Sequence, residues 1–142
     1  MKVSIRHTGI VTSNLNESLN FWQKFFGFKV YKDINEAGKT LDKVLKIKNV
    51  NVRTLKLKDN KNGQIELLFF KNIKKNKEKG IKTFSNGITH ISITVKNIDE
   101  IYKKLKKKIK FNSKPLLSED GKVKMTYCKT PEGAFLELVE EI

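Results

Sequence analysis

Apolar residues recur at helical spacing in two stretches of the chain, and the same polar signal precedes each stretch. The first stretch carries Leu15, Leu19, Trp22, Phe25 and Phe26 and stops at Gly27. The second carries Ile98, Ile101, Tyr102, Leu105 and Ile109, with lysines on the other faces. Asn-x-x-Glu opens both, at 14–17 and 97–100, where Asn accepts from an early helix N–H and Glu reaches back as a capping box. The pattern predicts two amphipathic helices, each packed on a sheet.

Strand-like runs surround both predicted helices. A short extended run precedes each helix. The runs that follow are 28–34, 50–57 and 64–70 in the first half, then Phe111 onward, 123–128 and 134–139 in the second. Residues 71–87 are polar and lysine-rich and predict a linker, while residues 37–48 show no clear pattern. Each half therefore reads β-α-β-β-β, which predicts an α+β fold with repeats at 1–70 and 88–142 in a single domain, 1–142.

The sequence itself repeats. Residues 7–17 align with residues 90–100 without a gap, and the matches include His/His, Asn/Asn and Glu/Glu. The two halves also end alike, because 63–68 and 133–139 differ by one inserted residue. An internal repeat of this kind indicates two equivalent structural modules.

The composition limits where the protein works. No apolar run approaches the roughly 20 residues that cross a bilayer, and the N-terminus lacks the features of a signal peptide. A single cysteine, Cys128, excludes an intramolecular disulfide and fits a reducing compartment. We therefore expect a cytoplasmic protein without a membrane partner. Cys128 ends an alternating strand, and no spare histidine is present to activate it, so we expect a structural role.

The net charge of +15 favours binding to an anionic partner. Only Arg6 and Arg53 are arginine among the 30 basic residues, whereas readers of nucleic acid favour the planar guanidinium group. The lysine-rich stretches 71–82 and 103–110 do not interleave aromatic residues with arginines. Nucleic-acid binding is therefore the weakest reading. Coding bias accounts for the lysines better, and an anionic small molecule is the expected partner.

Four residues carry candidate chemistry. His7 and His90 are the only histidines and begin the first strand of each half, while Glu66 and Glu137 lie in the last strands. Taken singly, each is more often an ordinary structural residue. The glutamates lie in apolar runs, where an unpaired charge is costly, so a lysine or a metal must compensate. Two imidazoles and two carboxylates suit one divalent ion, Zn, Ni, Co, Mn or Fe, with positions left open for substrate.

The repeat, the histidine-initiated segments and the endings "GQIELLFF" and "TPEGAFLELVEEI" resemble the vicinal-oxygen-chelate superfamily. This resemblance implies paired βαβββ modules whose curved mixed sheets form a cup, with His7, Glu66, His90 and Glu137 holding the metal inside. It also implies a homodimer, since members are commonly dimers. The superfamily includes lactoylglutathione lyase, methylmalonyl-CoA epimerase, dioxygenases and metal-free bleomycin-binding proteins.

The presence of a second glutamate, Glu66, limits which branches of the superfamily the chain resembles. Dioxygenases and fosfomycin-resistance transferases resemble one another in using two histidines and one glutamate, so Glu66 favours the lyase and epimerase branches, which move a proton next to a carbonyl through a metal-bound enediolate or enolate. Of these, a glyoxalase I-like lyase or isomerase is the expected function. A methylmalonyl-CoA epimerase-like enzyme is the alternative. Thr89, where epimerases usually have a second histidine, and a strand 50–56 without a carboxylate count against it. A non-catalytic ligand-binding protein is a further alternative.

Roles follow from the same resemblance. Glu137 is the expected general base and Glu66 the alternative, while the histidines remain neutral ligands. Arg6 and Arg53 are the candidates to contact a carboxylate or phosphate of the substrate.

Overall fold

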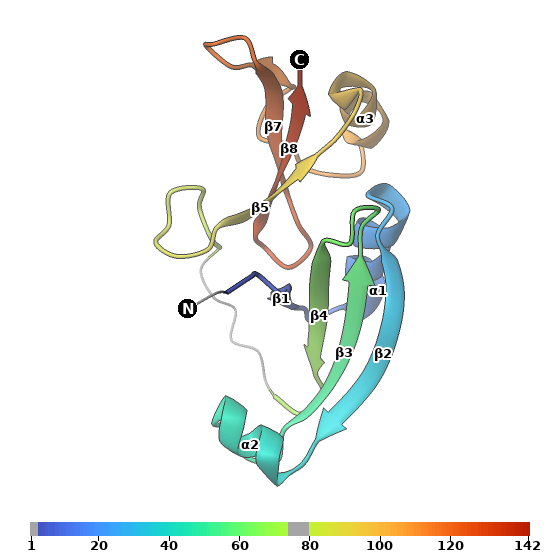
Figure 1. Cartoon of the computed structure of the whole chain (residues 1–142), viewed down its shortest axis with the longest axis vertical. Coiled ribbons are helices and arrows are strands. Elements are labelled where there is room, and N and C mark those ends of the chain that lie inside the picture. Colours follow the sequence, from blue (N-terminus) through green and yellow to red (C-terminus); the bar gives the residue numbers. More distant parts are fainter. Residues whose placement is uncertain (1–2, 74–79) are drawn as a thin grey trace. The chain divides into compact units, whose positions relative to one another are not determined.

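The computed structural model describes residues 3–73 and 80–142 of the chain (Figure 1). The chain forms two compact units, Met1–Lys77 and Glu78–Ile142. Part of the predicted linker, residues 74–79, lies outside the described residues. No helix in the described ranges is long and apolar enough to span a membrane.

Unit 1 is a four-stranded mixed sheet with helical segments between its strands. Its elements are β1 (Thr8–Val11), α1 (Leu15–Leu19), the π-helical continuation η1 (Asn20–Phe25), β2 (Lys29–Ala37), α2 (Lys39–Leu45), β3 (Asn51–Lys58) and β4 (Gln64–Phe70). The strand order is β1-β4-β3-β2, with β1 parallel to β4 and the other pairs antiparallel. The first and last strands of the module are therefore neighbours, although most of the module separates them in sequence.

Unit 2 repeats this order. Its elements are β5 (His90–Thr94), α3 (Ile98–Leu105), β6 (Leu116–Leu117), β7 (Val123–Lys129) and β8 (Phe135–Glu141). The sheet order is β5-β8-β7-β6, and β5 is again parallel to the last strand. The α+β prediction with two tandem βαβββ modules is thus confirmed, and so is the strand at 64–70.

Three local details differ from the expectation. The patternless segment 37–48 contains the helix α2, and β2 continues beyond residue 34 to Ala37. The strand expected from Phe111 onward is reduced to an isolated bridge between Phe111 and Cys128, followed by the two-residue β6. An edge strand of this length offers little unpaired backbone to other chains.

The two helix starts are built differently. The side chain of Asn14 accepts from the backbone N–H of Glu17 at 3.2 Å, which confirms the Asn14 half of the predicted capping box. The backbone N–H of Asn14 donates to the hydroxyl of Thr12 at 3.0 Å, and not to Glu17 as predicted. Asn97 instead adopts a left-handed conformation, with φ of 57°, and its side chain caps nothing. The carboxylate of Glu140 accepts from the backbone N–H groups of Asn97 and Ile98. The capping-box prediction was wrong for α3, because a carboxylate from β8 supplies the acceptor that the local pattern assigned to Asn97.

The faces of the unit 1 sheet follow from strand alternation. Leu55 and Leu57 on β3 pair with Leu67 and Ile65 on β4, and all four are buried on one face, where apolar residues predominate. Helix residue Leu15 lies beside Arg53 and Phe69 of this same face, so the helix covers it. The opposite face carries residues 54, 56, 66 and 68, and its polar members form the candidate site.

Candidate functional site

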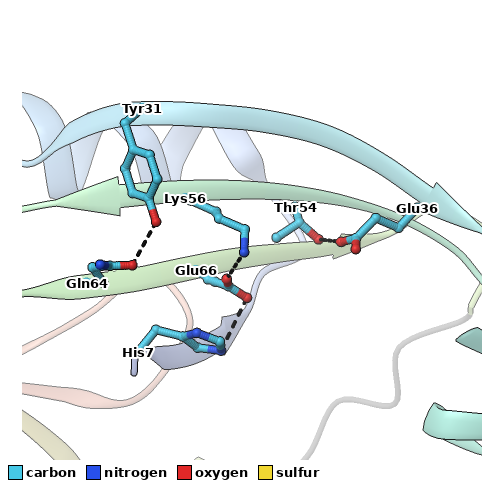
Figure 2. Close-up of polar contacts among 7 residues, drawn as sticks. All are labelled: His7, Tyr31, Glu36, Thr54, Lys56, Gln64 and Glu66. Carbon is cyan, nitrogen blue, oxygen red and sulfur yellow. Dashed lines mark hydrogen bonds and ion pairs between the residues drawn. The ribbon is translucent and has the colours of Figure 1, made fainter. Parts of the chain in front are cut away.

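Glu66 is the centre of a three-residue polar cluster in unit 1 (Figure 2). Its Oε2 lies 3.3 Å from Nε2 of His7, and its Oε1 lies 2.6 Å from the ammonium of Lys56. Only 11% of the Glu66 side chain is exposed. A carboxylate this deeply buried is stable in the charged form only if cations or donors compensate it, and here both oxygens have a partner.

Strand pairing brings the three residues together. Lys56 on β3 is the register partner of Glu66 on β4, and His7 immediately precedes β1, the other neighbour of β4. The hydrogen bond to Glu66 raises the pKa of Lys56, although burial opposes this change. Lys56 is therefore a permanent cation beside Glu66 at neutral pH.

Unit 2 contains the equivalent His/Glu pair with a different third residue. Nε2 of His90 lies 3.9 Å from Oε2 of Glu137, and Nδ1 of His90 lies 3.1 Å from the hydroxyl of Thr89. The register partner of Glu137 is Tyr127, whose ring meets the His90 ring edge to face at 5.4 Å. Burial, and then a hydrogen bond to Glu137, raise the pKa of Tyr127. The phenol thus stays protonated and donates to the carboxylate.

The donor atoms within each unit suit a divalent metal. Two ligands bound at about 2.0–2.2 Å are separated from each other by roughly 3 to 3.5 Å in tetrahedral or octahedral geometry. The spacing of 3.3 Å between His7 and Glu66 falls within this interval, and the 3.9 Å between His90 and Glu137 is slightly wider. In the described ranges, 3–73 and 80–142, no three His, Cys, Asp or Glu side chains form a group able to hold an ion. Within the described residues, each unit therefore presents one His/Glu pair.

Further polar side chains extend along the same face of unit 1 (Figure 2). The hydroxyl of Thr54 donates to Glu36 at 2.7 Å, and the hydroxyl of Tyr31 donates to Gln64 at 2.7 Å. No pattern in the sequence singled out Lys56, Glu36 or Tyr127. Strand alternation places Lys56 and Tyr127 on a common face only once their registers with Glu66 and Glu137 are known.

Residues 4–138 match the family model described as "Glyoxalase/Bleomycin resistance protein/Dioxygenase superfamily". The chain belongs to this superfamily. No curated protein matches the sequence significantly.

Solved structures agree with this superfamily assignment. A glyoxalase family protein from Bacillus cereus aligns with a TM-score of 0.89 and 19% identity, covering 100% of this chain and 96% of that one. The trypanothione-dependent glyoxalase I of Leishmania major aligns with a TM-score of 0.65 and 20% identity over 99% of this chain and 88% of that one. A glyoxalase I variant from Zea mays has a TM-score of 0.65 and 18% identity, covering 94% and 43% of the two chains. At these identities the likeness establishes the glyoxalase-like fold.

The two arginines predicted to meet substrate occupy different places. Arg53 lies on the helix-covered face, opposite Glu66, and its guanidinium binds both carboxylate oxygens of Asp33 at 2.6 and 3.0 Å. This hydrogen-bonded ion pair lowers the pKa of Asp33. Arg6 is exposed next to His7, and its charge acts on Lys56. Of the two arginines, only Arg6 is thus associated with the cluster of His7, Lys56 and Glu66.

Cys128 is fully buried on β7, and this burial raises the pKa of its thiol to about 12. A thiol of this kind is almost entirely protonated at neutral pH and is a poor nucleophile. The expected structural role of Cys128 is consistent with both observations.

Proposed function

We propose that this protein is a glyoxalase I-like lyase or isomerase that holds one divalent metal ion with His7, Glu66, His90 and Glu137. The observation that carries the proposal is the repetition of a His/Glu pair at equivalent positions of both units. His7 immediately precedes β1 and Glu66 lies on the neighbouring strand β4, while His90 and Glu137 lie on the paired strands β5 and β8. A repeated placement of ligand-type residues on neighbouring strands is unexpected for unrelated surface charges.

The two glutamates have different partners, which suggests that only one of them acts as the general base. When bound, a divalent metal supplies Lewis-acid stabilisation of the negative charge that develops on a substrate oxygen. Glu66 is held by the ammonium of Lys56, whereas Glu137 faces the neutral phenol of Tyr127. Moving Glu137 disrupts a weaker, neutral-donor contact, so Glu137 is the better general base for a proton next to a carbonyl.

The proposed substrate is an anionic small molecule, such as a glutathione hemithioacetal or an acyl-CoA. The exposed Arg6 beside His7 and the net charge of +15 supply attraction for an anion. A homodimer belongs to the same proposal, since members of the superfamily are commonly dimers. A cytoplasmic location and a single functional domain over residues 1–142 are also proposed, from the composition and length of the chain.

Two alternatives have specific support. Lys56 already gives Glu66 a cation, as a metal-free ligand-binding protein would require. Glu36 places a carboxylate from β2 on the same face as Glu66, which offers an epimerase the additional base that β3 lacks. The double His/Glu arrangement favours an enzyme over the metal-free protein, whereas Thr89 and the absence of a carboxylate from β3 favour the lyase or isomerase over the epimerase.

Metal titration after dialysis against a chelator tests the proposed site. We expect one Zn²⁺ or Co²⁺ per chain, with binding abolished in both His7→Ala and His90→Ala. Asp33→Asn, a carboxylate change on the helix-covered face, is the matched control and should bind normally. Loss of binding in only one histidine variant would exclude a site shared by the two units. No stoichiometric metal in the wild type would favour the ligand-binding alternative.

Proton transfer is tested separately. The metal-loaded protein, given a glutathione hemithioacetal in D₂O, should exchange or transfer the α-proton, as followed by NMR. Metal binding without any such exchange would leave the metal site standing and refute this choice of substrate.

A further inference from the structure

The ammonium of Lys56 lies directly against the carboxylate of Glu66. The Lys56 ammonium contacts Oε1 of Glu66 at 2.6 Å, while Oε2 faces His7 at 3.3 Å. The Glu66 carboxylate therefore contacts Lys56 with one oxygen and His7 with the other. Figure 2 shows these contacts on opposite sides of the carboxylate.

The contact is anchored by the backbone. Lys56 and Glu66 are register partners on antiparallel strands, so their Cβ atoms lie about 5 Å apart and the side chains share one face. Only 22% of the Lys56 side chain is exposed, which limits screening of its charge by water. The ammonium is thus held next to the proposed metal ligand in the folded protein.

Unit 2 has a neutral group at the matching register position. Tyr127 pairs with Glu137 as Lys56 pairs with Glu66, and Tyr127 donates a hydrogen bond without a formal charge. The module therefore folds with either residue opposite the glutamate. The positive charge at position 56 is a specific property of unit 1, beyond what the fold requires.

We propose that Lys56 is a tethered cation that competes with a divalent metal for Glu66 and so weakens metal binding at the site. The inference rests on the proposed function, because it assigns Glu66 as a metal ligand. A divalent ion held by Glu66 would be repelled by the Lys56 ammonium, which contacts the same carboxylate at 2.6 Å. Metal binding must displace the ammonium or tolerate this repulsion.

Metal affinity measured by competition with a chromophoric chelator tests the idea, with Zn²⁺ and Co²⁺ as probes. Lys56→Gln keeps an N–H donor toward Glu66 but removes the charge, and it should bind at least tenfold more tightly than the wild type. Lys56→Arg keeps the charge and should stay within about threefold of the wild type. Lys58→Gln is the matched control, because Lys58 is exposed two positions along the same strand, and it should not change affinity.

A second readout needs no enzyme activity. In the presence of a chelator, Lys56→Gln should melt at a lower temperature than the wild type, because Glu66 loses its counter-ion. Added Zn²⁺ should raise the melting temperature of Lys56→Gln by more than it raises that of the wild type. Lys58→Gln should follow the wild type in both conditions.

The outcomes separate the two proposals. If the wild type binds metal through His7 and His90 but Lys56→Gln binds equally or more weakly, the tethered-cation proposal is overturned and the metal site stands. Tightening of the same size in Lys56→Arg would also overturn it, because the charge would then not matter. If neither wild type nor Lys56→Gln binds metal more tightly than His7→Ala, the proposed metal site fails, and the role of Lys56 fails with it.

Discussion

Replacing each glutamate by glutamine should separate the structural carboxylate from the catalytic one. Glu66→Gln leaves the Lys56 ammonium, 22% exposed and previously 2.6 Å from a carboxylate oxygen, facing a neutral amide. Leaving one member of a half-buried ion pair without its partner costs about 1–3 kcal/mol. In a chain of this size that corresponds to a fall in melting temperature of roughly 3–10 °C.

Glu137→Gln should be much milder for stability. The glutamine carbonyl still accepts from the phenol of Tyr127, so we expect a loss of only about 0.5 kcal/mol and a shift under roughly 2 °C. Each substitution raises the net charge of +15 by one, so general repulsion affects both variants alike and cancels in the comparison. Thermal unfolding in excess chelator measures this difference without a contribution from metal.

Turnover should show the opposite order. At saturating metal, Glu137→Gln should lose about 10²-fold or more, the usual scale for a missing general base, and Glu66→Gln should lose less. α-Proton exchange of a glutathione hemithioacetal in D₂O is the assay. A reversed order would make Glu66 the base. Full activity in both variants would refute the mechanism, and equal melting temperatures would refute the assigned role of Lys56 in holding Glu66.

Three further outcomes are expected. Cys128, with a thiol pKa of about 12, should resist iodoacetamide at pH 8 in the folded protein and react in denaturant; rapid labelling of the native chain would contradict its burial. Arg53→Ala should leave the KM for an anionic substrate unchanged and Arg6→Ala should raise it several-fold, because Arg53 lies on the helix-covered face; kinetics with both variants decides this. The same KM should rise with ionic strength over the Debye range, because salt screens the attraction between the lysines and an anionic substrate. A KM that does not change with salt would refute this attraction and favour coding bias as the reason for the many lysines.

Local patterns in the sequence determined the module. The period of apolar residues predicted the two helices, and the alignment of residues 7–17 with residues 90–100 predicted that one βαβββ unit is used twice. The pairing of each histidine with a glutamate followed from the same repeat, because equivalent residues of equivalent modules occupy equivalent positions. These inferences needed only neighbours in sequence or the repeat itself.

Strand register decided what the sequence left open. A shift of one residue between β3 and β4 exchanges the two faces of a strand, so sequence alone did not assign Arg53 to the helix-covered face or Lys56 to the face of Glu66. The same holds for Tyr127 beside Glu137 and for Glu140, which caps α3 from β8. These contacts join residues far apart in the chain, and only the folded sheet brings their side chains within bonding distance.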